Sequence, residues 1–321
     1  MRLWQSAMIS LAKSEKVTAA MQSSAFMQRF ASQFVGGTNG SQALDTVARL
    51  RERGIRTSVF CLGEYVRDAD LVEQCVLDLL HIVPKLSEVG LDTHVSIDPT
   101  QMGASIDWTL CAANVKRVVD CVAQLITTPQ RKVLMLDMED SSITDATLNL
   151  WNTLHSNGYP VAITIQAYLR RSERDIRRLV EAGATVRLVK GALAEKADVA
   201  FRMRSDIDAN YRALTEMLLG ADAKTQGVYP AFGTHDERMI AHATERAKSN
   251  GWTHEQWEIE MLYGVRDALQ RQLVAKGHRL RLYMPFGKNF WPYSVRRIGE
   301  SPQNLQFVLR AMREVNHRHP Q

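Results

Sequence analysis

The feature that most constrains the fold is a repeated alternation of two kinds of segment. Short apolar runs rich in β-branched residues recur eight times, and segments with the spacing of amphipathic helices lie between them. Strands that alternate with helices pair in parallel, because each return to the sheet requires a crossover. The apolar runs are residues 57–62, 93–97, 133–138, 161–167, 185–189, 228–233, 257–262 and 279–284, and the clearest helical segments are 106–126, 172–182, 235–249 and 263–275.

Eight nearly continuous apolar strands predict that the sheet closes into a barrel covered by helices. The expected fold class is therefore α/β, a (βα)8 TIM-type barrel with an N-terminal helical arm. The 321 residues suit a barrel of about 250 residues with insertions. An open doubly wound sheet is the alternative, although the usual GxGxxG fingerprint after the first strand is absent from the sequence.

Two parts of the chain are expected from this pattern. Residues 1–48 precede the first strand and form the helical arm outside the barrel, and residues 49–321 form the catalytic barrel. The clearest break is residues 35–41, where Ser41 could cap the helix that follows.

Composition excludes several functional classes. Hydrophobic residues make up 45% and charged residues 23%, which is typical of a soluble globular protein. The net charge of +5 can attract anions, but the arginines form no basic arm with interleaved aromatic residues, so no nucleic-acid partner is expected. Four cysteines without a CxxC pair predict reduced thiols. No signal peptide or long apolar run is recognisable, which predicts a cytoplasmic protein and leaves peripheral membrane contact open.

Active-site residues of such barrels lie at the carboxyl ends of the strands. Polar side chains at these positions should be paired or ligand-bound, because burying an unpaired one costs several kcal/mol. Asp137 and Glu139 could instead form a carboxylate pair for acid–base or metal chemistry, but no histidine lies in their motif. The polar candidates are Glu64, Asp98, Asp137, Glu139, Gln166, Arg187, Lys190, Thr234, His235, Glu260 and Tyr283.

Two adjacent arginines near the end of the chain form the strongest local feature. Arg296 and Arg297 offer an array of N–H donors that suits a carboxylate. Tyr293 and Glu300 flank them at helical spacing, and Glu300 could hold one arginine in position. The alternative is a solvated basic helix end.

With these residues in view, the chain resembles the proline dehydrogenase family from about residue 30 to residue 310. Each motif alone is weak, but six in the family's order, followed by an intact Y-x-x-R-R-x-x-E pattern, are specific. The motifs are LDME at 136–139, IQAY at 165–168, VRLVKGA at 186–192, FGTH at 232–235, EMLYG at 260–264, YMPFG at 283–287 and YSVRRIGE at 293–300.

The resemblance implies a role for each matching residue around proline and FAD. Arg296 and Arg297 would hold the substrate carboxylate, and Asp137 would orient an arginine or close the site by an ion pair. Tyr283, Tyr293 and Leu262 would pack around the substrate ring.

The resemblance also implies how FAD would be held. Gln166 and Arg187 would hydrogen-bond the flavin ring, with Arg187 near its N5 atom. The ribityl and diphosphate portion would contact Lys190, Gly191, Ala192, Thr234 and His235.

Three positions depart from the family pattern. Asp98 stands where a lysine is usual, Phe60 where an aspartate is usual, and Glu260 where a glutamine is usual. Asp98 could pair with Arg296, Arg297 or Lys288 in a rewired proline site, or it could reflect a substituted or cationic proline analogue as substrate.

The function predicted from these features is FAD-dependent oxidation of L-proline to Δ1-pyrroline-5-carboxylate by hydride transfer to flavin N5. Electrons would pass on to a quinone or another acceptor. Three alternatives stay open: oxidation of a different proline-like amino acid, a flavin-free lyase or aldolase that uses Lys190 for a Schiff base, and a non-catalytic barrel that binds a flavin or a partner protein.

Overall fold

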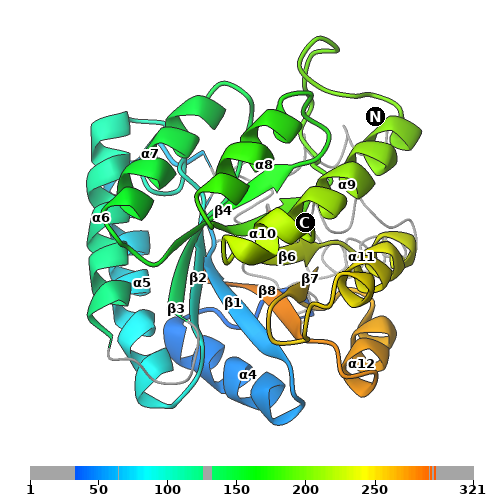
Figure 1. The fold of residues 1–321 in the computed structure, drawn as a ribbon. Helices are drawn as coiled ribbons and strands as arrows, with labels where there is room; N and C mark the ends of the chain where they lie inside the picture. The colour runs from blue at the N-terminus through cyan, green and yellow to red at the C-terminus, as the bar shows by residue number, and fades with distance from the viewer. Residues whose placement is uncertain (1–32, 64, 126–131, 289, 291–292, 294–321) are drawn as a thin grey trace, which may run out of the picture.

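The computed structural model describes residues 33–63, 65–125, 132–288, 290 and 293, and it contains eight parallel strands in one closed barrel (Figure 1). The strands follow one another around the barrel in chain order, and β8 closes the ring by pairing with β1. The predicted TIM-type barrel is confirmed. The strands are β1 (Arg56–Cys61), β2 (Thr93–Ile97), β3 (Lys132–Leu136), β4 (Val161–Gln166), β5 (Thr185–Val189), β6 (Tyr229–Gly233), β7 (Glu258–Leu262) and β8 (Leu280–Phe286).

Helices surround the barrel and bury the outward faces of the strands (Figure 1). Their apolar sides and the strands together form one continuous hydrophobic core, with residues such as Val95 and Ile97 fully buried. The helices are α4 (Gly40–Glu52), α5 (Ala69–Glu88), α6 (Trp108–Gln124), α7 (Thr144–Ser156), α8 (Ser172–Glu181), α9 (Arg204–Leu218), α10 (Ala221–Thr225), α11 (Glu237–Ser249) and α12 (Asp267–Ala275).

Helix α4 leads into the barrel and corrects one expectation. Its N-cap is Asn39, whose side-chain oxygen accepts a hydrogen bond from the backbone N–H of Gln42 at 3.0 Å. The expectation that Ser41 is the cap is wrong, because Ser41 already lies in the first helical turn. The helix continues through residue 48, where we placed the end of the arm, and residues 1–32 of that arm lie outside the described residues.

Three predicted helices, α6, α11 and α12, begin later than their apolar spacing suggests, and the last two follow strands that lead into the site. Helix α11 begins at Glu237, because the Asp236 carboxylate caps it by accepting from the backbone N–H of Arg238. Helix α12 begins only at Asp267, after Arg266 adopts a left-handed backbone with φ of 59°. Both shifts lengthen the loops that follow β6 and β7, and these loops carry residues of the site.

The interior of the barrel is largely polar. Side chains alternate along a strand, so every second residue faces the axis. On β8, Arg281 is fully buried and donates to Glu258 at 2.8 Å, to Asp92 at 2.9 Å and to the backbone oxygen of Thr57 at 2.8 Å. These pairs neutralise the charges at the amino-terminal end of the barrel.

The described residues hold no helix long and apolar enough to cross a membrane. The four cysteines form no disulfide with one another in the described residues.

Candidate active site

Two adjoining cavities open at the carboxyl ends of the strands. The larger has a volume of about 730 Å³ and the smaller about 330 Å³. Asp98, Thr234 and His235 line both, so the two cavities meet at these residues. The strand ends on which the resemblance to the family rested are therefore neighbours in space.

The smaller cavity brings together the residues expected around the substrate ring. Tyr283 comes from β8, Leu262 ends β7, and Tyr293 follows β8. Asp137 lies just after β3 and Arg187 lies on β5, and both contribute to the wall. Arg296, Arg297 and Glu300 lie outside the described residues, so their predicted roles stay predictions.

Arg187 is the best-anchored charged side chain of this cavity. It is 4% exposed, and it donates to Asp137 at 2.6 Å, to Glu260 at 2.7 Å and to the Ser96 hydroxyl at 3.0 Å. Burial opposes its charge, but the two carboxylates outweigh this and raise its pKa above the ordinary arginine value. The guanidinium is thus a permanent, fixed positive charge in the wall of the cavity.

Glu260 has an unusual environment for an acid. Burial raises its pKa to about 7, and the neighbouring charge of Glu258 acts in the same direction, against the attraction of Arg187 and Arg281. Only one of its oxygens has a partner, since Oε1 makes no hydrogen bond within the described part of the chain. The carboxyl group is therefore poised between its two protonation states.

The Tyr283 ring packs over the charged groups around Arg187. Its ring lies over the Arg187 guanidinium, 5.4 Å from the Cζ atom, and its centroid is 5.1 Å from that of Phe60. Burial, together with Asp137 and Asp98, raises the pKa of the Tyr283 hydroxyl well above its ordinary value. Tyr283 therefore stays neutral, and the apolar ring of Phe60 packs against it.

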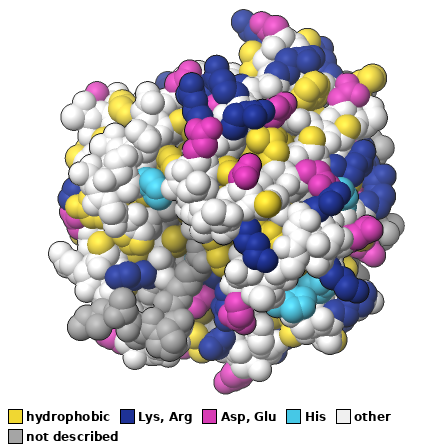
Figure 2. Space-filling view, in the orientation of Figure 1, with side chains coloured by type: hydrophobic (Ala, Val, Ile, Leu, Met, Phe, Trp, Pro, Cys, Tyr) yellow, Lys and Arg dark blue, Asp and Glu magenta, His cyan; other side chains and the backbone are white. Residues whose placement is uncertain are grey.

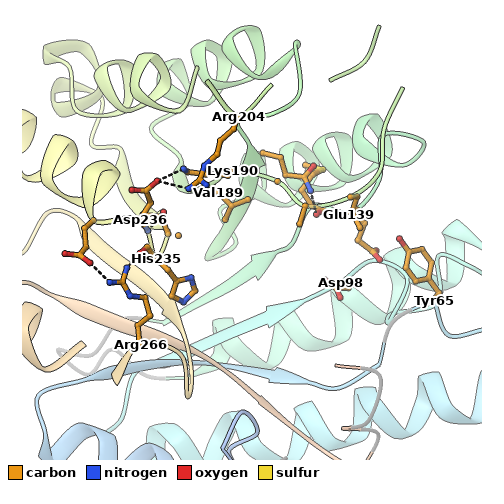
Figure 3. A pocket seen from close by; sticks show the side chains of 17 residues that line it. Tyr65, Asp98, Glu139, Val189, Lys190, Arg204, His235, Asp236 and Arg266 are labelled. Atoms are coloured by element: carbon orange, nitrogen blue, oxygen red, sulfur yellow. Dashed lines mark hydrogen bonds and ion pairs between the residues drawn. The ribbon is translucent and has the colours of Figure 1, made fainter. Parts of the chain in front are cut away.

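The larger cavity is lined by cations that are already engaged with acids. Lys190 contacts the carboxylate of Asp236 at 2.8 Å (Figure 3). It also contacts the carboxylate of Asp208, and Arg266 pairs with Glu237. Hydrogen bonds from Arg238 and then from Lys190 hold the pKa of Asp236 well below its usual range. Among the described residues, these contacts use two of the three donors of the Lys190 ammonium, which leaves one for a ligand.

The remaining residues expected at the cofactor also line the larger cavity. Gly191 has a φ of 92°, and a Cβ there would overlap the Tyr168 ring, so only glycine fits this turn. Ala192 follows it in the wall. Thr234 is buried and accepts from the backbone N–H of Asp236 at 3.1 Å.

His235 and Gln166 are each held by a backbone group. His235 Nε2 accepts from the backbone N–H of Leu262 at 3.0 Å, so in the neutral ring Nδ1 carries the proton. Gln166 Nε2 donates to the backbone oxygen of Met138 at 3.0 Å, whereas its buried Oε1 has no partner among the described residues. An acceptor of this kind in a cavity wall suits a ligand N–H group.

Asp137 and Glu139 do not act as a pair. Asp137 accepts from Arg187 and from the Thr164 hydroxyl at 2.7 Å, whereas Glu139 accepts from the backbone N–H and hydroxyl of Thr100 at 2.8 and 2.5 Å. The alternative of a joint acid–base or metal site at these two carboxylates is not supported by this geometry.

The network beneath Arg187 contains residues that the sequence did not single out. His94 Nδ1 bonds the Ser58 hydroxyl at 2.8 Å, and Ser58 bonds Ser96 at 2.8 Å. Ligand-type atoms of His94, Glu258 and Glu260 lie within 4.8 Å of one another, although Glu258 is already occupied by Arg281. The available signal was the alternation of polar residues inside apolar strands, as in the THVSI of β2.

Comparison with known proteins identifies the family. The model of the family described as proline dehydrogenase matches residues 43–310. Proline dehydrogenase 2 of Bacillus subtilis (strain 168) is 31% identical over 283 residues, which cover 88% of this chain and 90% of that protein. Proline dehydrogenase of Deinococcus radiodurans is 31% identical over 316 residues, 97% of this chain and 98% of that protein. The chain belongs to the proline dehydrogenase family.

A solved structure of a larger protein shares the fold. Proline utilization A from Bdellovibrio bacteriovorus, inactivated by N-propargylglycine, superimposes with a TM-score of 0.76 at 24% identity, over 85% of this chain and 32% of that one. The family membership predicted from the motifs is confirmed by the family model and by these relatives, and the likeness to the larger protein supports the barrel fold.

Proposed function

We propose that this protein is a proline dehydrogenase that oxidises L-proline to Δ1-pyrroline-5-carboxylate with FAD as its cofactor. One observation carries the proposal: a small cavity bounded by Tyr283, Tyr293 and Leu262 opens into a larger one beside a fixed arginine, Arg187. The first has room for a five-membered ring and the second for an extended dinucleotide. The family membership of the chain gives these cavities their chemistry.

The residues of the larger cavity fit a flavin dinucleotide. The buried Oε1 of Gln166 needs a donor, and the ring N–H of a flavin is one. Lys190 and His235 would lie along the ribityl and diphosphate portion with Gly191, Ala192 and Thr234. Bound FAD would supply an acceptor for the hydride, which no protein side chain can provide.

The residues of the smaller cavity would align the substrate and exclude water. Tyr283, Tyr293 and Leu262 would hold the substrate ring in place, and Arg296 and Arg297 would bind its carboxylate. Hydride loss requires an uncharged substrate nitrogen, because a cation there resists losing a negative hydride. Solvent would remove that proton before the transfer, so the contribution of the site is mainly orientation.

Asp98 decides how closely the substrate must resemble proline. It lines both cavities at their junction, where the family usually has a lysine. A negative charge there disfavours a second carboxylate and favours a substrate with an extra positive charge. We infer proline as the substrate, with a cationic proline analogue as the alternative that Asp98 supports.

Lys190 argues against a Schiff-base lyase or aldolase. Its nitrogen donates to two carboxylates, whereas a Schiff-base lysine attacks through a lone pair. We propose a quinone or another external oxidant as the final acceptor of the electrons.

The test is an anaerobic titration of the purified, flavin-loaded protein with L-proline, followed by flavin absorbance. Bleaching of the oxidised flavin band is the expected result, and hydroxylated and cationic proline analogues serve as comparison substrates. A protein that retains no flavin when FAD is supplied would contradict the cofactor. Bleaching by an analogue but not by proline would contradict proline as the substrate.

The arginine pair is tested separately. Changing Arg296 or Arg297 to Met is expected to weaken substrate binding while flavin content stays constant. Loss of flavin instead would contradict their assignment to the substrate carboxylate.

A further inference from the structure

Glu260 is the one departure from the family pattern that lies directly on the fixed arginine. Its Oε2 accepts from Arg187 Nε at 2.7 Å, and both side chains line the smaller cavity. The glutamine usual at this position could accept the same bond, but it could neither carry a charge nor exchange a proton. The carboxyl group therefore adds a property that the family pattern lacks.

Charged and titratable groups face Glu260 from several strands. Arg187 on β5 and Arg281 on β8 favour its ionised form, and Glu258 on β7 disfavours it. His94 on β2 lies within 4.8 Å of Glu260 through its ring nitrogen. Asp137, after β3, shares the Arg187 guanidinium with Glu260 and so competes for its charge.

The local charge balance leaves room for one proton. Glu260 Oε1 is buried and has no hydrogen-bond partner within the described residues, so it can accept a proton without breaking the Arg187 bond at Oε2. With its pKa raised to about 7, the group changes charge near neutrality. The smaller cavity that Glu260 lines provides a path for protons from solvent.

We propose that Glu260 is a proton-binding positioning residue: ionised, it holds Arg187 in place, and when a bound flavin is reduced it takes up one proton from solvent. The proposal rests on the proposed function, because it requires a flavin beside Arg187. Glu260 does not itself touch the reacting atoms and acts through Arg187.

The step balances as follows. Transfer of a hydride breaks one substrate C–H bond and delivers two electrons and one proton to the flavin, which thereby gains one negative charge. The negative charge on the flavin attracts the Arg187 guanidinium and offsets part of its positive charge. The attraction that keeps the Glu260 carboxylate ionised is thereby weakened. Glu260 then binds one proton from solvent at Oε1, and the wall regains its former net charge.

The flavin midpoint potential reports this proton. Below about pH 7, Glu260 is protonated in both redox states, and reduction consumes one proton for two electrons. Above this pH it is ionised only in the oxidised state, and reduction consumes two. Each proton contributes a tenfold change in the equilibrium constant per pH unit, about 30 mV for a two-electron couple. The slope is therefore expected to double on the alkaline side of neutrality.

The experiment measures the potential of the intact, flavin-loaded protein spectroelectrochemically between pH 5.5 and 9. The wild type is expected to give a line that bends and becomes steeper near pH 7, whereas Glu260→Gln should give one constant slope. Glu216→Gln is the matched control, because it removes one negative charge on α9 at an ion pair with Arg246, outside the barrel. The potential of Glu216→Gln, plotted against pH, should bend as that of the wild type does.

A second measurement begins with the wild type. The infrared difference spectrum between oxidised and reduced wild type at pH 8 should contain a new carboxylic-acid carbonyl band, and Glu260→Gln, which should lack the band, assigns it to Glu260. The inference is wrong if the wild-type potential plotted against pH is a single straight line, or if Glu260→Gln shows the same bend. In either case, reduction of the flavin by proline would leave the proposed function intact. A bend in the other direction, shallower at high pH, belongs to the flavin ring and also overturns the inference. A protein that binds no flavin would overturn both this inference and the proposed function.

Discussion

Arg187 shows how much of the site depends on a single buried side chain. Its partners are Glu260 on β7, Ser96 on β2 and Asp137 just after β3, and none of them is near it in sequence. A buried ion pair is costly to break, because removing one partner leaves an uncompensated charge. The orientation of Arg187 is therefore sensitive to each of its three partners.

Asp137→Asn tests this dependence. The amide keeps an acceptor for Arg187 but removes the charge, so we expect a loss of about 1–3 kcal/mol in the free energy of unfolding. Denaturant unfolding measures the loss, and Asp145→Asn is the control, since Asp145 is 79% exposed and pairs with Arg171 at the surface. That control should cost less than about 1 kcal/mol. Equal effects of both substitutions would contradict the buried role of Asp137.

At the scale of elements, loops and caps decide where the site residues stand. Asp236 caps α11 and also holds Lys190, so the start of one helix fixes a cation of the larger cavity. The turn after β5 needs Gly191 because its backbone is left-handed and Tyr168 fills the space beside it. Both devices connect local backbone geometry directly to the cavity wall.

Gly191→Ala should therefore disturb cofactor binding. A methyl group there overlaps the Tyr168 ring, so we expect destabilisation of about 1–3 kcal/mol and reduced FAD content, measured by the flavin-to-protein absorbance ratio. Gly158→Ala is the matched control, with a similar φ of 77° but open space around the added Cβ. It should lose stability without losing flavin. Full flavin content in Gly191→Ala would refute the importance of the turn.

The cap of α4 offers a second comparison between neighbours. Asn39→Ala removes the side-chain bond to Gln42 and should cost about 1 kcal/mol of stability, read from the midpoint of urea unfolding. Ser41→Ala, in the first turn of the same helix, should change it by less than about 0.5 kcal/mol. The opposite ranking would restore Ser41 as the cap.

The sequence predicts strands better than it predicts contacts. Strand positions follow from apolar runs, and both ends of all eight strands lie within two residues of the predicted ones, with 93–97 and 185–189 unchanged. Helix starts are less predictable, because they depend on which polar side chain caps the turn, as Asn39 and Asp236 do. The motifs predicted which residues gather at the strand ends. The pairing of Arg187 with Ser96, 91 positions apart, is set by closure of the barrel, and no pattern in the sequence around either residue predicts it.

At the scale of the whole molecule, charge is distributed very differently inside and outside. On the face shown in Figure 2, Lys and Arg side chains lie among Asp and Glu side chains rather than in one continuous basic band. Inside the barrel, arginines and carboxylates are stacked from Arg281 and Glu258 at one end to Arg187 and Glu260 towards the other. The stability of the fold should therefore respond to pH through interior groups.

Glu260, which is buried, and Asp236, which is half-buried, give the pH dependence opposite signs. The raised pKa of Glu260 means that the folded state binds its proton more tightly, so stability is lost as pH rises from about 4.5 to about 7, by up to roughly 3 kcal/mol. The depressed pKa of Asp236 gives stability above its usual value of 3.8 that disappears as pH falls below it. Urea unfolding across pH should show a smaller alkaline decline for Glu260→Gln than for the wild type. Parallel curves would contradict the raised pKa of Glu260.

The pairing of β8 with β1 has a consequence for biosynthesis. Six residue pairs join the two strands, and Arg281 donates to Thr57, 224 positions earlier in the chain. β1 leaves the ribosome long before β8. Until most of the chain has been translated, the edge of β1 that pairs with β8 therefore has no partner strand, and the carboxylates that pair with Arg281 lack their cation. We expect closure of this seam to be a late event of maturation, and nascent-chain binding by chaperones to persist until β8 emerges.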